Sequence, residues 1–566
     1  MTLGLTPRQA DLFRSTVGFC EPRVAPDSIY GLLHRECHRL FPDEMFADLF
    51  TDVGRRSVPP MIVAVVMVLQ RIEGCSDREA VDRFSFDARW KYAAGGLDFD
   101  YPGFVHTVLV DMRARLADSQ RPDRIFGAVL EVAKAAGLVG RKRVLDSTPI
   151  YDAVATMDTV TLVRSGIRGV LRAADSALEA RLRAVLSGQD DFTSAGKPVC
   201  DWDDRAAREQ LVDALAKDGR AVLAVLEGQA LPEAVTAAGA LLATLLGQDL
   251  EAGQAGVFRI ARRVAKDRVI STVDPQARHG HKTAARGFDG YKGHLGIDPD
   301  SEVITATAVT AGNAGDASVA EELIADLLPE QSDAADPADD SPVDDSDGPV
   351  TSGAGKPAAG DGEPADGLVD GQSDEAEPAV VYGDNAYGTG AFHDRLARAG
   401  VESKCKTQHP VNTGGRFAKD EFVIDLQQDS VTCPAGNTAP IRRGDKGAGT
   451  ASFGPVCAGC PLRERCTTAV AGRAVKVGAH EEQLAAARAR QRHPDWVGDY
   501  RATRPKVERK IGHLMRRKHG GRRARVRGQV KVAADFALLA AAVNLARMAV
   551  LSVVSVPGTG WTVETA

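Results

Sequence analysis

The sequence predicts a mixed α/β fold: a sheet with one helical domain before its first strand and a helical insertion after that strand. Residues 1–125 contain apolar residues at helical spacing. Short apolar runs of strand type end at Asp146 and at Asp384, and a hairpin pattern lies between them. The segment 159–264 is rich in Ala, Leu and Arg, again at helical spacing. Together these patterns indicate a sheet core flanked and interrupted by helices.

The first 125 residues begin with clear helix signals. Pro59 and Pro60 open a predicted helix that runs to Ile72, and Gly74 breaks it. Ser76 caps a second helix over 77–84, and a third apolar segment covers 104–116. Two helices joined by a short turn that contains glycine fit a DNA-binding helix-turn-helix and an ordinary helical bundle equally well. Both interpretations stay open at this point.

The predicted sheet core is discontinuous in the chain. Its first part covers 140–158 and 265–328, and its second part covers 379–427. The first strand ends at Asp146, and the insertion 159–264 follows it. The predicted elements after the insertion are strands over 290–298 and 302–310, a helix over 317–328 and a strand over 379–382.

Charge is distributed very unevenly along the chain. The segment 330–378 contains fifteen acidic residues and one basic residue, so the rest of the chain is net positive although the total is −7. Because the segment 329–378 has almost no large apolar residues, we expect a disordered acidic loop. It could mimic DNA in a basic groove or be a tolerated surface insertion. Between 501 and 531 there are thirteen Lys or Arg residues and a single acid, Glu508, which indicates a densely anionic partner.

Composition excludes several protein classes. A chain of 566 residues with 44% hydrophobic residues can build a large core. The N-terminus lacks the pattern of a signal peptide, and the apolar runs 61–69 and 536–543 are too short to cross a bilayer. Nine cysteines in such a chain do not indicate a disulfide framework. We therefore expect a cytoplasmic protein without a membrane partner.

Three carboxylates indicate metal-assisted chemistry on a phosphate. Asp146 and Asp384 follow strand-like runs, and α/β sheets bind ligands at such strand ends. Glu508 lies in the most basic stretch of the chain. Converging carboxylates suit Mg²⁺, and basic surroundings suit a nucleic-acid phosphate. The alternative for each acid taken alone is a helix cap or a turn residue.

Four short motifs carry a resemblance to a known family. They are Val144-Leu145-Asp146-Ser147-Thr148, Gly290-Tyr291-Lys292, Tyr382-Gly383-Asp384-Asn385-Ala386-Tyr387, and Arg504 with Glu508 four positions later. In this order they resemble the DDE transposases of bacterial insertion sequences, the group with a Tyr-Arg-Glu signature. The resemblance implies a ribonuclease-H-like core, in which strands one and four are neighbours, so that Asp384 would lie beside Asp146.

The resemblance also implies an activity. Such an enzyme uses Mg²⁺ or Mn²⁺ held by Asp146, Asp384 and Glu508 to cut phosphodiesters at element ends, and the freed 3′-OH then attacks target DNA. The implied partners are double-stranded DNA, as terminal inverted repeats and as target, and further copies of the chain. Residues 1–125 would help to hold the ends, and the cytoplasmic protein would join the nucleoid when bound to DNA.

The basic segment 476–553 departs from the family pattern in two ways. Tyr500 lies four positions before Arg504, one more than in the resembled group, and the usual lysine after Glu508 is missing. Arg504 shares a helix face with Glu508 and could position a DNA phosphate, while Arg516 could replace the lysine. The predicted DNA-binding residues are Tyr500, Arg504, Arg516, Arg517, Arg278 and Lys292.

A cysteine-rich segment, 428–475, precedes the basic helices. Cys457 and Cys460 form a Cys-x-x-Cys pair, and Cys433 and Cys466 lie on either side of it. Four thiolates complete a tetrahedral zinc site, which we expect to be structural and not catalytic. A redox pair is the alternative, although the segment lacks the strand-to-helix setting of such motifs.

Three functions remain open from the sequence. The first is a metal-dependent DDE transposase. The second is a catalytically inactive, transposase-derived DNA-binding protein, which the altered spacing at Tyr500 and the missing lysine would favour. The third is a ribonuclease-H-like nuclease that cuts DNA without strand transfer.

Overall fold

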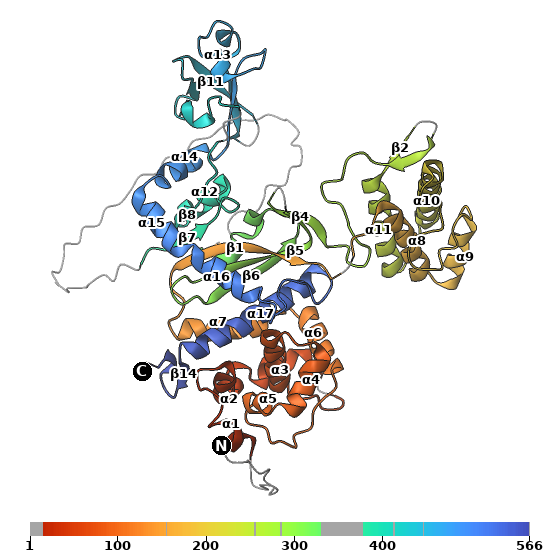
Figure 1. Cartoon of the computed structure of the whole chain (residues 1–566), viewed down its shortest axis with the longest axis vertical. Helices are drawn as coiled ribbons and strands as arrows, with labels where there is room; N and C mark the ends of the chain where they lie inside the picture. The colour runs from red at the N-terminus through yellow and green to blue at the C-terminus, as the bar shows by residue number, and fades with distance from the viewer. Residues whose placement is uncertain are drawn as a thin grey trace, which may run out of the picture.

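The computed structural model describes residues 15–51, 53–153, 155–253, 256–283, 286–329, 377–410, 414–444 and 447–564. A central sheet lies between an N-terminal helical domain, a helical insertion on one side and a small β-rich domain at the far end (Figure 1). The acidic loop predicted over 329–378 lies outside the described residues, apart from its ends.

The N-terminal domain is helical, as predicted. Pro60 is the first residue of α3, and Gly74 ends it in a left-handed conformation with φ 69°. Ser76 and Glu79 form a capping box at the start of α4. The elements are α1 (Thr16–Cys20), α2 (Ile29–Leu40), the 3-10 helix η1 (Asp43–Leu49), α3 (Pro60–Glu73), α4 (Asp77–Phe86), α5 (Ala88–Ala93), α6 (Thr107–Asp118) and α7 (Arg124–Ala135).

The helix pair α3–α4 belongs to a bundle. Every residue of α3 from Met61 to Ile72 is buried, and the helix packs against α4, α6 and the C-terminal helix α17 (Gln529–Val550). The exposed face of α4 mixes charges, with Arg78 beside Glu79 and Asp82. The two helices thus pack within a bundle, and the helix-turn-helix interpretation stays a prediction.

The central sheet contains parallel and antiparallel strands. Its strands are β1 (Lys142–Tyr151), β4 (Arg278–Thr283), β5 (Arg286–Ile297), β6 (Ile304–Ala311), β7 (Val380–Gly383) and β8 (Glu402–Cys405). The order across the sheet is β6-β5-β1-β7-β8, and β4 pairs with β5 just beyond the end of β6. The pairs β1–β5 and β5–β6 are antiparallel, whereas β1–β7 and β7–β8 are parallel. This mixed sheet is consistent with a ribonuclease-H-like core.

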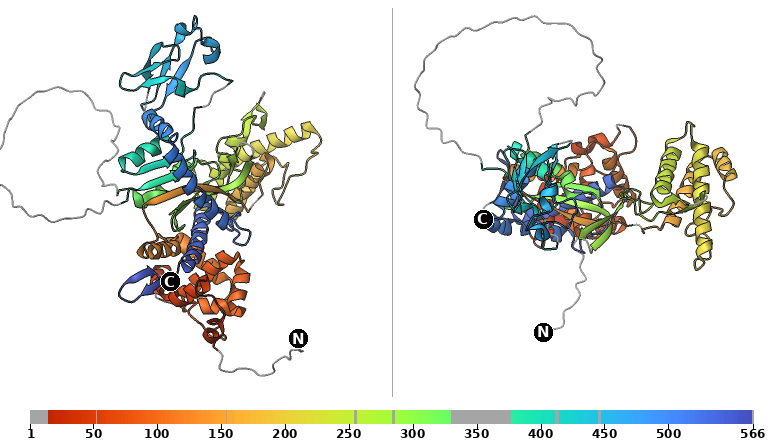
Figure 2. Two further views of the ribbon diagram at one scale, coloured as in Figure 1. Left: turned by 60° about the vertical axis from the view of Figure 1, so that its left-hand side comes forward. Right: turned by 90° about the horizontal axis from the view of Figure 1, so that it is seen from above.

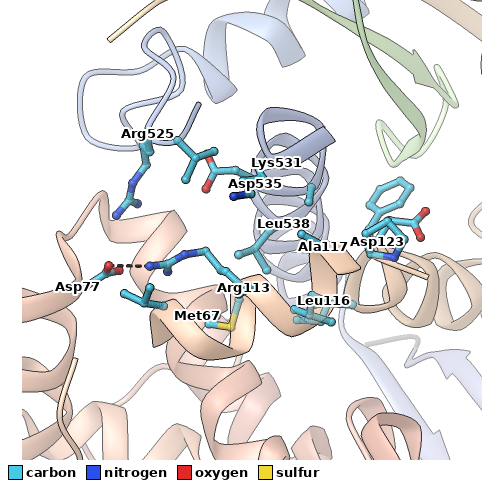
Figure 3. Close-up of a pocket in the computed structure, with 17 residues that line it drawn as sticks. Met67, Asp77, Arg113, Leu116, Ala117, Asp123, Arg525, Lys531, Asp535 and Leu538 are labelled. Atoms are coloured by element: carbon cyan, nitrogen blue, oxygen red, sulfur yellow. Dashed lines mark hydrogen bonds and ion pairs between the residues drawn. The ribbon is translucent and has the colours of Figure 1, made fainter. Parts of the chain in front are cut away.

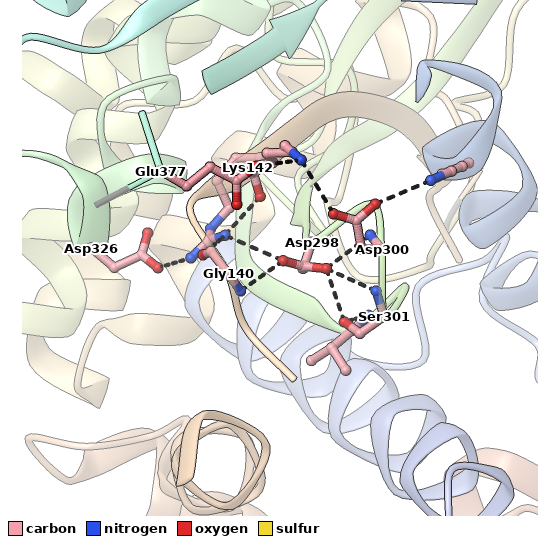
Figure 4. Close-up of polar contacts among 10 residues, drawn as sticks. Gly140, Lys142, Asp298, Asp300, Ser301, Asp326 and Glu377 are labelled. Carbon is pink, nitrogen blue, oxygen red and sulfur yellow. Dashed lines mark hydrogen bonds and ion pairs between the residues drawn. The ribbon is translucent and has the colours of Figure 1, made fainter. Parts of the chain in front are cut away.

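A buried carboxylate connects the start of β1 to the β5–β6 turn. Asp298 accepts hydrogen bonds from the backbone N–H groups of Gly140 (2.9 Å), Asp300 (2.9 Å) and Ser301 (2.8 Å) (Figure 4). Arg143 on β1 lies 3.9 Å from the same carboxylate. Because these contacts come from both segments, they fix where β1 enters the sheet.

Two sequence predictions for the core were wrong in detail. Asp146 does not end a strand: β1 continues to Tyr151, since its second half pairs with β5. That half has no partner in β7, so Pro149 occupies an edge position, where proline is tolerated.

The predicted helix over 317–328 is the second difference. The segment forms two 3-10 helices, η3 (Asp316–Val319) and η4 (Glu322–Leu327). Ile324 leaves helical geometry with φ −125°, and both Leu323 and Ile324 are buried. Adjacent residues of an α-helix point about 100° apart, so the kink lets both side chains reach the core.

The insertion after β1 is a helical domain with a hydrophobic core of its own. It contains α8 (Thr159–Ala173), α9 (Ser176–Ala184), α10 (Arg205–Leu226) and α11 (Glu233–Asp249), followed by the hairpin β2 (Leu250–Ala252) and β3 (Phe258–Ile260). Figure 2 shows it projecting to one side of the rest of the molecule. The Leu and Val stripes of these helices are core packing, as their spacing predicts.

The cysteine-rich segment is a small β domain. An antiparallel sheet of order β13-β12-β11-β10-β9 carries it. The elements are η5 (Lys419–Glu421), β9 (Val423–Asp425), β10 (Ser430–Thr432), β11 (Thr438–Arg443), β12 (Gly449–Ser452), η7 (Gly454–Cys457), α13 (Arg463–Cys466) and β13 (Ala474–Val477). The sequence did not predict this sheet, whose strands have three to six residues each.

Helices complete the C-terminal half, and the longest of them, α17, is the core helix of the molecule. They are α12 (Gly390–Arg398), α14 (Glu481–Arg490), α15 (Pro494–Thr503), α16 (Pro505–Leu514) and α17, followed by the hairpin β14 (Val553–Val556) and β15 (Gly560–Val563). Buried Asn544 joins α17 to β6, because its side chain donates to Ile304 O and accepts from Ile304 N, both at 2.8 Å.

Among the described helices, α17 alone is long and apolar enough to cross a membrane. It packs against β6, α3 and α7, and 72% of its apolar window is buried inside the protein. A cavity of about 340 Å³ lies between α17 and the N-terminal helices, beside the Asp77–Arg113 ion pair (Figure 3). Because most of its apolar surface is buried inside the protein, α17 is a core helix.

Candidate active site

Asp146 and Asp384 lie at the same level of the sheet. In the parallel pair β1–β7, Val144 is opposite Tyr382, so Asp146 is level with Asp384, the residue that follows β7. The Asp146 side chain is 15% exposed and that of Asp384 is 45% exposed. The sheet register therefore brings together two carboxylates that are far apart in the sequence.

Asp384 is held by the turn that follows β7. Its carboxylate accepts a hydrogen bond from Ala386 N at 2.9 Å, and its carbonyl accepts from Tyr387 N and Gly388 N. Partial burial raises the pKa of the Asp384 carboxyl, and the bond from Ala386 and the charge of Arg504 offset only part of the rise.

Glu508 reaches the same place from a helix. α16 packs against β1 and begins at Pro505, directly after α15. Glu508 lies on its first turn, and its side chain is 64% exposed. Of the three acids, it is the most open to solvent.

Arg504, at the junction of α15 and α16, lies between all three acids. Its guanidinium is 2.9 Å and 3.2 Å from the two oxygens of Asp146, 3.9 Å from Asp384 and 3.9 Å from Glu508. Its side chain is only 7% exposed. Burial lowers the pKa of Arg504, but the charge and hydrogen bond of Asp146, together with Tyr500 and Asp384, raise it above its usual value. The predicted acids thus converge on one buried cation.

The aromatic residues of α15 support this arrangement. The hydroxyl of Tyr500 donates to Gly383 O at 3.2 Å, next to Asp384. Its ring stacks on Trp496 with centroids 4.9 Å apart, and burial raises the pKa of Tyr500 to about 12. Tyr500 is therefore a neutral phenol that connects α15 to the end of β7.

A fourth acid, Asp316, lies beside the site and was not predicted from the sequence. Asp316 accepts hydrogen bonds from Ser147 Oγ (2.6 Å) and Lys292 Nζ (2.8 Å). Buried His294 bonds Thr310 and Tyr387 in the same region, and burial lowers its pKa to about 4. Asp316 follows β6 as Asp384 follows β7, so an acid soon after a predicted strand was the signal that could have found it.

The six predicted DNA-binding residues lie in different settings. Lys292, 15% exposed, is bound to Asp316, and Arg278, 14% exposed, pairs with Asp267 at 2.7 Å. Tyr500 and Arg504 belong to the acid site. Arg516 and Arg517 are exposed in the loop between α16 and α17. These two arginines alone of the six present their charge to solvent.

The four clustered cysteines lie close together in the small β domain. Cys433, Cys457, Cys460 and Cys466 line one cavity of about 20 Å³, roughly the space of a single water molecule. All four are free thiols, and the backbone N–H of Arg473 contacts the Cys457 sulfur at 3.4 Å. The four cysteines of the predicted site therefore face a common space.

Metal sites require a tighter arrangement than the described residues show. No group of three or more His, Cys, Asp or Glu side chains in the described part of the chain is placed so that it could hold a metal ion. In the acid site, the guanidinium of Arg504 lies where the carboxylates converge. The donor set, three carboxylates, nevertheless has the oxygen chemistry that Mg²⁺ and Mn²⁺ prefer.

Comparison with protein families gives three matches to this chain. Two family models, both described as a transposase DDE domain, match residues 259–336 and 432–549, and a third, described as a transposase domain, matches 23–115. The chain belongs to the DDE transposases of insertion-sequence type. Its matched domains support a nuclease activity that serves transposition, with DNA as the substrate. No curated protein and no solved structure matches the chain.

The matched ranges cover only part of the candidate site. The region 432–549 contains Glu508, Arg504 and the four cysteines, and the region 259–336 contains Asp316 and Lys292. Asp146 and Asp384 lie outside the matched ranges. Their assignment rests on the sheet register and on the shared contact with Arg504.

Proposed function

We propose that this transposase uses Asp146, Asp384 and Glu508 to cut DNA at the ends of its element and to join the freed 3′-OH to target DNA. The observation that carries the proposal is the convergence of the three carboxylates on one guanidinium. Three acids from a strand, a turn and a helix have no structural need to meet. Metal-assisted phosphodiester cleavage uses such a group of carboxylates to hold the ions.

The carboxylates would hold Mg²⁺ or Mn²⁺. A divalent ion supplies Lewis-acid stabilisation of the charge that develops at the phosphate. The chain supplies position: Asp146 is fixed within β1, the backbone of Ala386 orients Asp384, and α16 carries Glu508. Arg504 neutralises the acids in this structure and, once released from Asp146, can reach a DNA phosphate with its planar donor fork.

DNA would approach from the side of the basic loop after α16. Arg516 and Arg517 are exposed there, within the segment 501–531, which carries thirteen basic residues and a single acid. Contacts of this type bind any sequence and weaken steeply with salt. Arg278 is paired with Asp267, and Lys292 is paired with Asp316. We therefore assign Arg278 and Lys292 to positioning the core strands.

The cysteine cluster would hold a structural zinc ion. Four thiols around one small cavity are the ligand set of a closed zinc site, and the domain has a small core that a metal would stabilise. The redox alternative would require a disulfide that forms and breaks.

We further propose that the protein acts as a homo-oligomer on DNA and that in the cell it is cytoplasmic, joining the nucleoid when bound. Two element ends must be processed together, which a pair of active sites achieves. Light scattering with and without a duplex of the gene's flanking ends tests this. A monomer on DNA at saturation would contradict it.

The activity is tested with purified protein, Mg²⁺ or Mn²⁺ and a labelled duplex from the flanking ends of its own gene. Wild-type protein is compared with Asp384→Asn, Glu508→Gln and two controls, Asp111→Asn and Glu482→Gln, which alter exposed helix acids outside the site. We expect cutting at the element boundary by wild type and both controls only.

Three other outcomes separate the alternatives. Binding without cutting by any protein indicates a transposase-derived DNA-binding protein. Cutting without joining to a target plasmid indicates a nuclease. Equal cutting by wild type and Asp384→Asn would mean that the catalytic acids are misassigned.

A further inference from the structure

The cavity between α17 and the N-terminal helices has the size and the lining of a small-molecule site (Figure 3). Its volume of about 340 Å³ falls within the range of such sites. An apolar cavity of about 150 Å³ holds one benzene molecule, so this one has room for a body of two rings. The helices α3, α6, α7 and α17 each contribute an apolar side chain to its walls, in turn Met67, Val110, Phe126 and Leu538.

Two of the acids on the walls of this cavity already have cations of their own. Asp77 accepts a hydrogen bond from Arg113 at 2.5 Å. Asp535 lies 3.2 Å from Arg71, a buried arginine that is outside the lining. The third acid, Asp123, is exposed just before α7, at the far end of the cavity from the basic loop between α16 and α17 (Figure 3). The end of the cavity beside that loop therefore has no unneutralised acid among the described residues.

Arg525 lines the cavity from the basic loop and keeps an unused donor. Its half-buried side chain extends toward the Asp77–Arg113 pair (Figure 3). Its Nη2 donates to Cys75 O at 2.6 Å, which fixes the guanidinium. Its Nη1 is buried and has no hydrogen-bond partner in the described part of the chain. Lys531, exposed at the rim, adds a second positive charge. Because a buried charged donor without a partner is unfavourable, an anionic acceptor placed beside it is stabilised.

We propose that this cavity binds a small amphipathic anion, a molecule with an apolar body of up to two rings and one carboxylate, phosphate or sulfonate group. The apolar body packs against the side chains of α3, α6, α7 and α17. The anionic group accepts a hydrogen bond from Nη1 of Arg525, and Lys531 adds a favourable charge at the rim. Such a ligand would join the N-terminal domain to the basic loop. The inference goes beyond the proposed function, because none of the three proposed catalytic acids takes part.

The test uses two dyes that share the same rings and differ in charge, added to the full-length protein without DNA. Anilinonaphthalene sulfonate carries one sulfonate group, and phenylnaphthylamine is its neutral counterpart. The fluorescence of both rises in apolar surroundings, so a titration gives a Kd for each. We expect Arg525→Gln to weaken binding of the sulfonate dye by about tenfold, the usual loss for a hydrogen bond to a charged group. Binding of the neutral dye should stay unchanged. Arg527→Gln, an exposed arginine of the same loop outside the lining, should bind both dyes normally.

Variants that fill the cavity should weaken binding of both dyes. Ala534→Phe on α17 and Ala114→Phe on α6 each place a ring at a lining position. Ala114 is exposed, so its variant should fold even if Ala534→Phe does not, and thermal unfolding checks both. Ala177→Phe, at an exposed position of α9 in the insertion, is the matched control and should bind both dyes as wild type does.

Four results would overturn the proposal. The first is the absence of saturable binding of the sulfonate dye to wild type. The second is an equal loss of both dyes in Arg525→Gln, which would show that the anionic group makes no bond there. Unchanged binding in both filled variants would place the dyes elsewhere on the protein. Dye affinity that falls as the protein concentration rises would assign the cavity to a second copy of the chain.

Discussion

At the residue scale, the central feature is the position of Arg504 between three carboxylates. A guanidinium presents several donors in one plane, so one side chain can approach Asp146 with both nitrogens and remain within 3.9 Å of Asp384 and Glu508. A lysine could offer only one point of charge. Arg504 is thus the counter-ion of the three acids.

Replacing Arg504 should therefore destabilise the metal-free protein. In Arg504→Gln the buried carboxylate of Asp146 loses its partner, and we expect a loss of about 3 kcal/mol in the free energy of unfolding. The double variant Asp146→Asn/Arg504→Gln should recover much of this loss. Mg²⁺ should raise the thermal midpoint of Arg504→Gln more than that of wild type, because the ion no longer competes with the guanidinium. Arg509→Gln, on the same helix, is the control; equal Mg²⁺ effects in all proteins would contradict this role.

His393 predicts a pH dependence of stability. It is 3% exposed and bonded to Thr407 and Ser403, and burial lowers its pKa to about 4 from 6.5. As the pH falls below about 6.5, the unfolded chain binds the proton first, so stability is lost between about pH 6.5 and about pH 4. From pH 7 to pH 5 this residue should cost about 2 kcal/mol.

The measurement for His393 is urea unfolding at pH 7 and pH 5, with the imidazole titration followed by NMR. His393→Gln should show a smaller loss of stability on acidification than wild type. His409→Gln, an exposed histidine nearby, should behave as wild type. An NMR pKa near 6.5 for His393 would contradict the argument.

At the element scale, the N-terminal helices are set by local sequence signals, whereas we expect the small β domain to depend on a bound metal. α3 is capped by Pro60 and Gly74, and α4 by Ser76 and Glu79, so their ends follow from local chemistry. The strands β9–β13 are too short to be recognised from periodicity. The core of that domain includes Cys466, with Cys433 and Cys457 packed against it, so we expect its stability to depend on the metal.

Zinc removal should selectively unfold the small β domain. Purified protein should contain about one zinc per chain, and Cys457→Ser with Cys460→Ser should contain none. Amide exchange in 414–478 should then increase while the central sheet stays protected. Cys200→Ser, outside the cluster, is the control. Full zinc content in the double variant, or a Cys457–Cys460 disulfide in place of the metal, would refute the zinc site.

At the scale of the whole molecule, charge of opposite sign is divided between two regions. The total is −7, but the segment 330–376 contains fourteen acidic residues and one basic residue, and its deletion would change the net charge to +6. The basic segment 501–531 carries Glu508, the proposed catalytic residue, and the loop with Arg516 and Arg517. A chain of net positive charge associates faster with DNA at low salt.

Replacing 330–376 by a short Gly-Ser linker should leave the fold intact and increase DNA affinity at low ionic strength. Circular dichroism and thermal unfolding check the fold, and binding of a non-specific duplex across a salt series checks the affinity. If the acidic segment also occupied the DNA site, the gain should persist at high salt and be reversed by adding the segment as a separate peptide. Loss of folding would contradict its assignment as an insertion.

The sequence by itself determined the helical N-terminal domain and most of the core strands, while the neighbouring positions of the first and fourth strands and the choice of the three acids came from the family resemblance. The helices and strands depend on signals between near neighbours: proline and glycine at helix ends, and alternating or continuous apolar runs. Even there, Asp146 was placed at the end of a strand that runs on to Tyr151, because strand length depends on pairing with β5.

Only the tertiary structure decided which groups meet. The contact of Arg504 with Asp146 joins residues 358 positions apart, and the bond of Ser147 to Asp316 joins residues 169 apart. A cavity lined by Trp496 is formed by segments after β7 and β8 and by α15, and Lys292, a predicted DNA contact, forms an ion pair with Asp316. Local sequence patterns predict the conformation of neighbouring residues. Contacts between residues this far apart depend on how the strands and helices pack, and no local pattern contains that information.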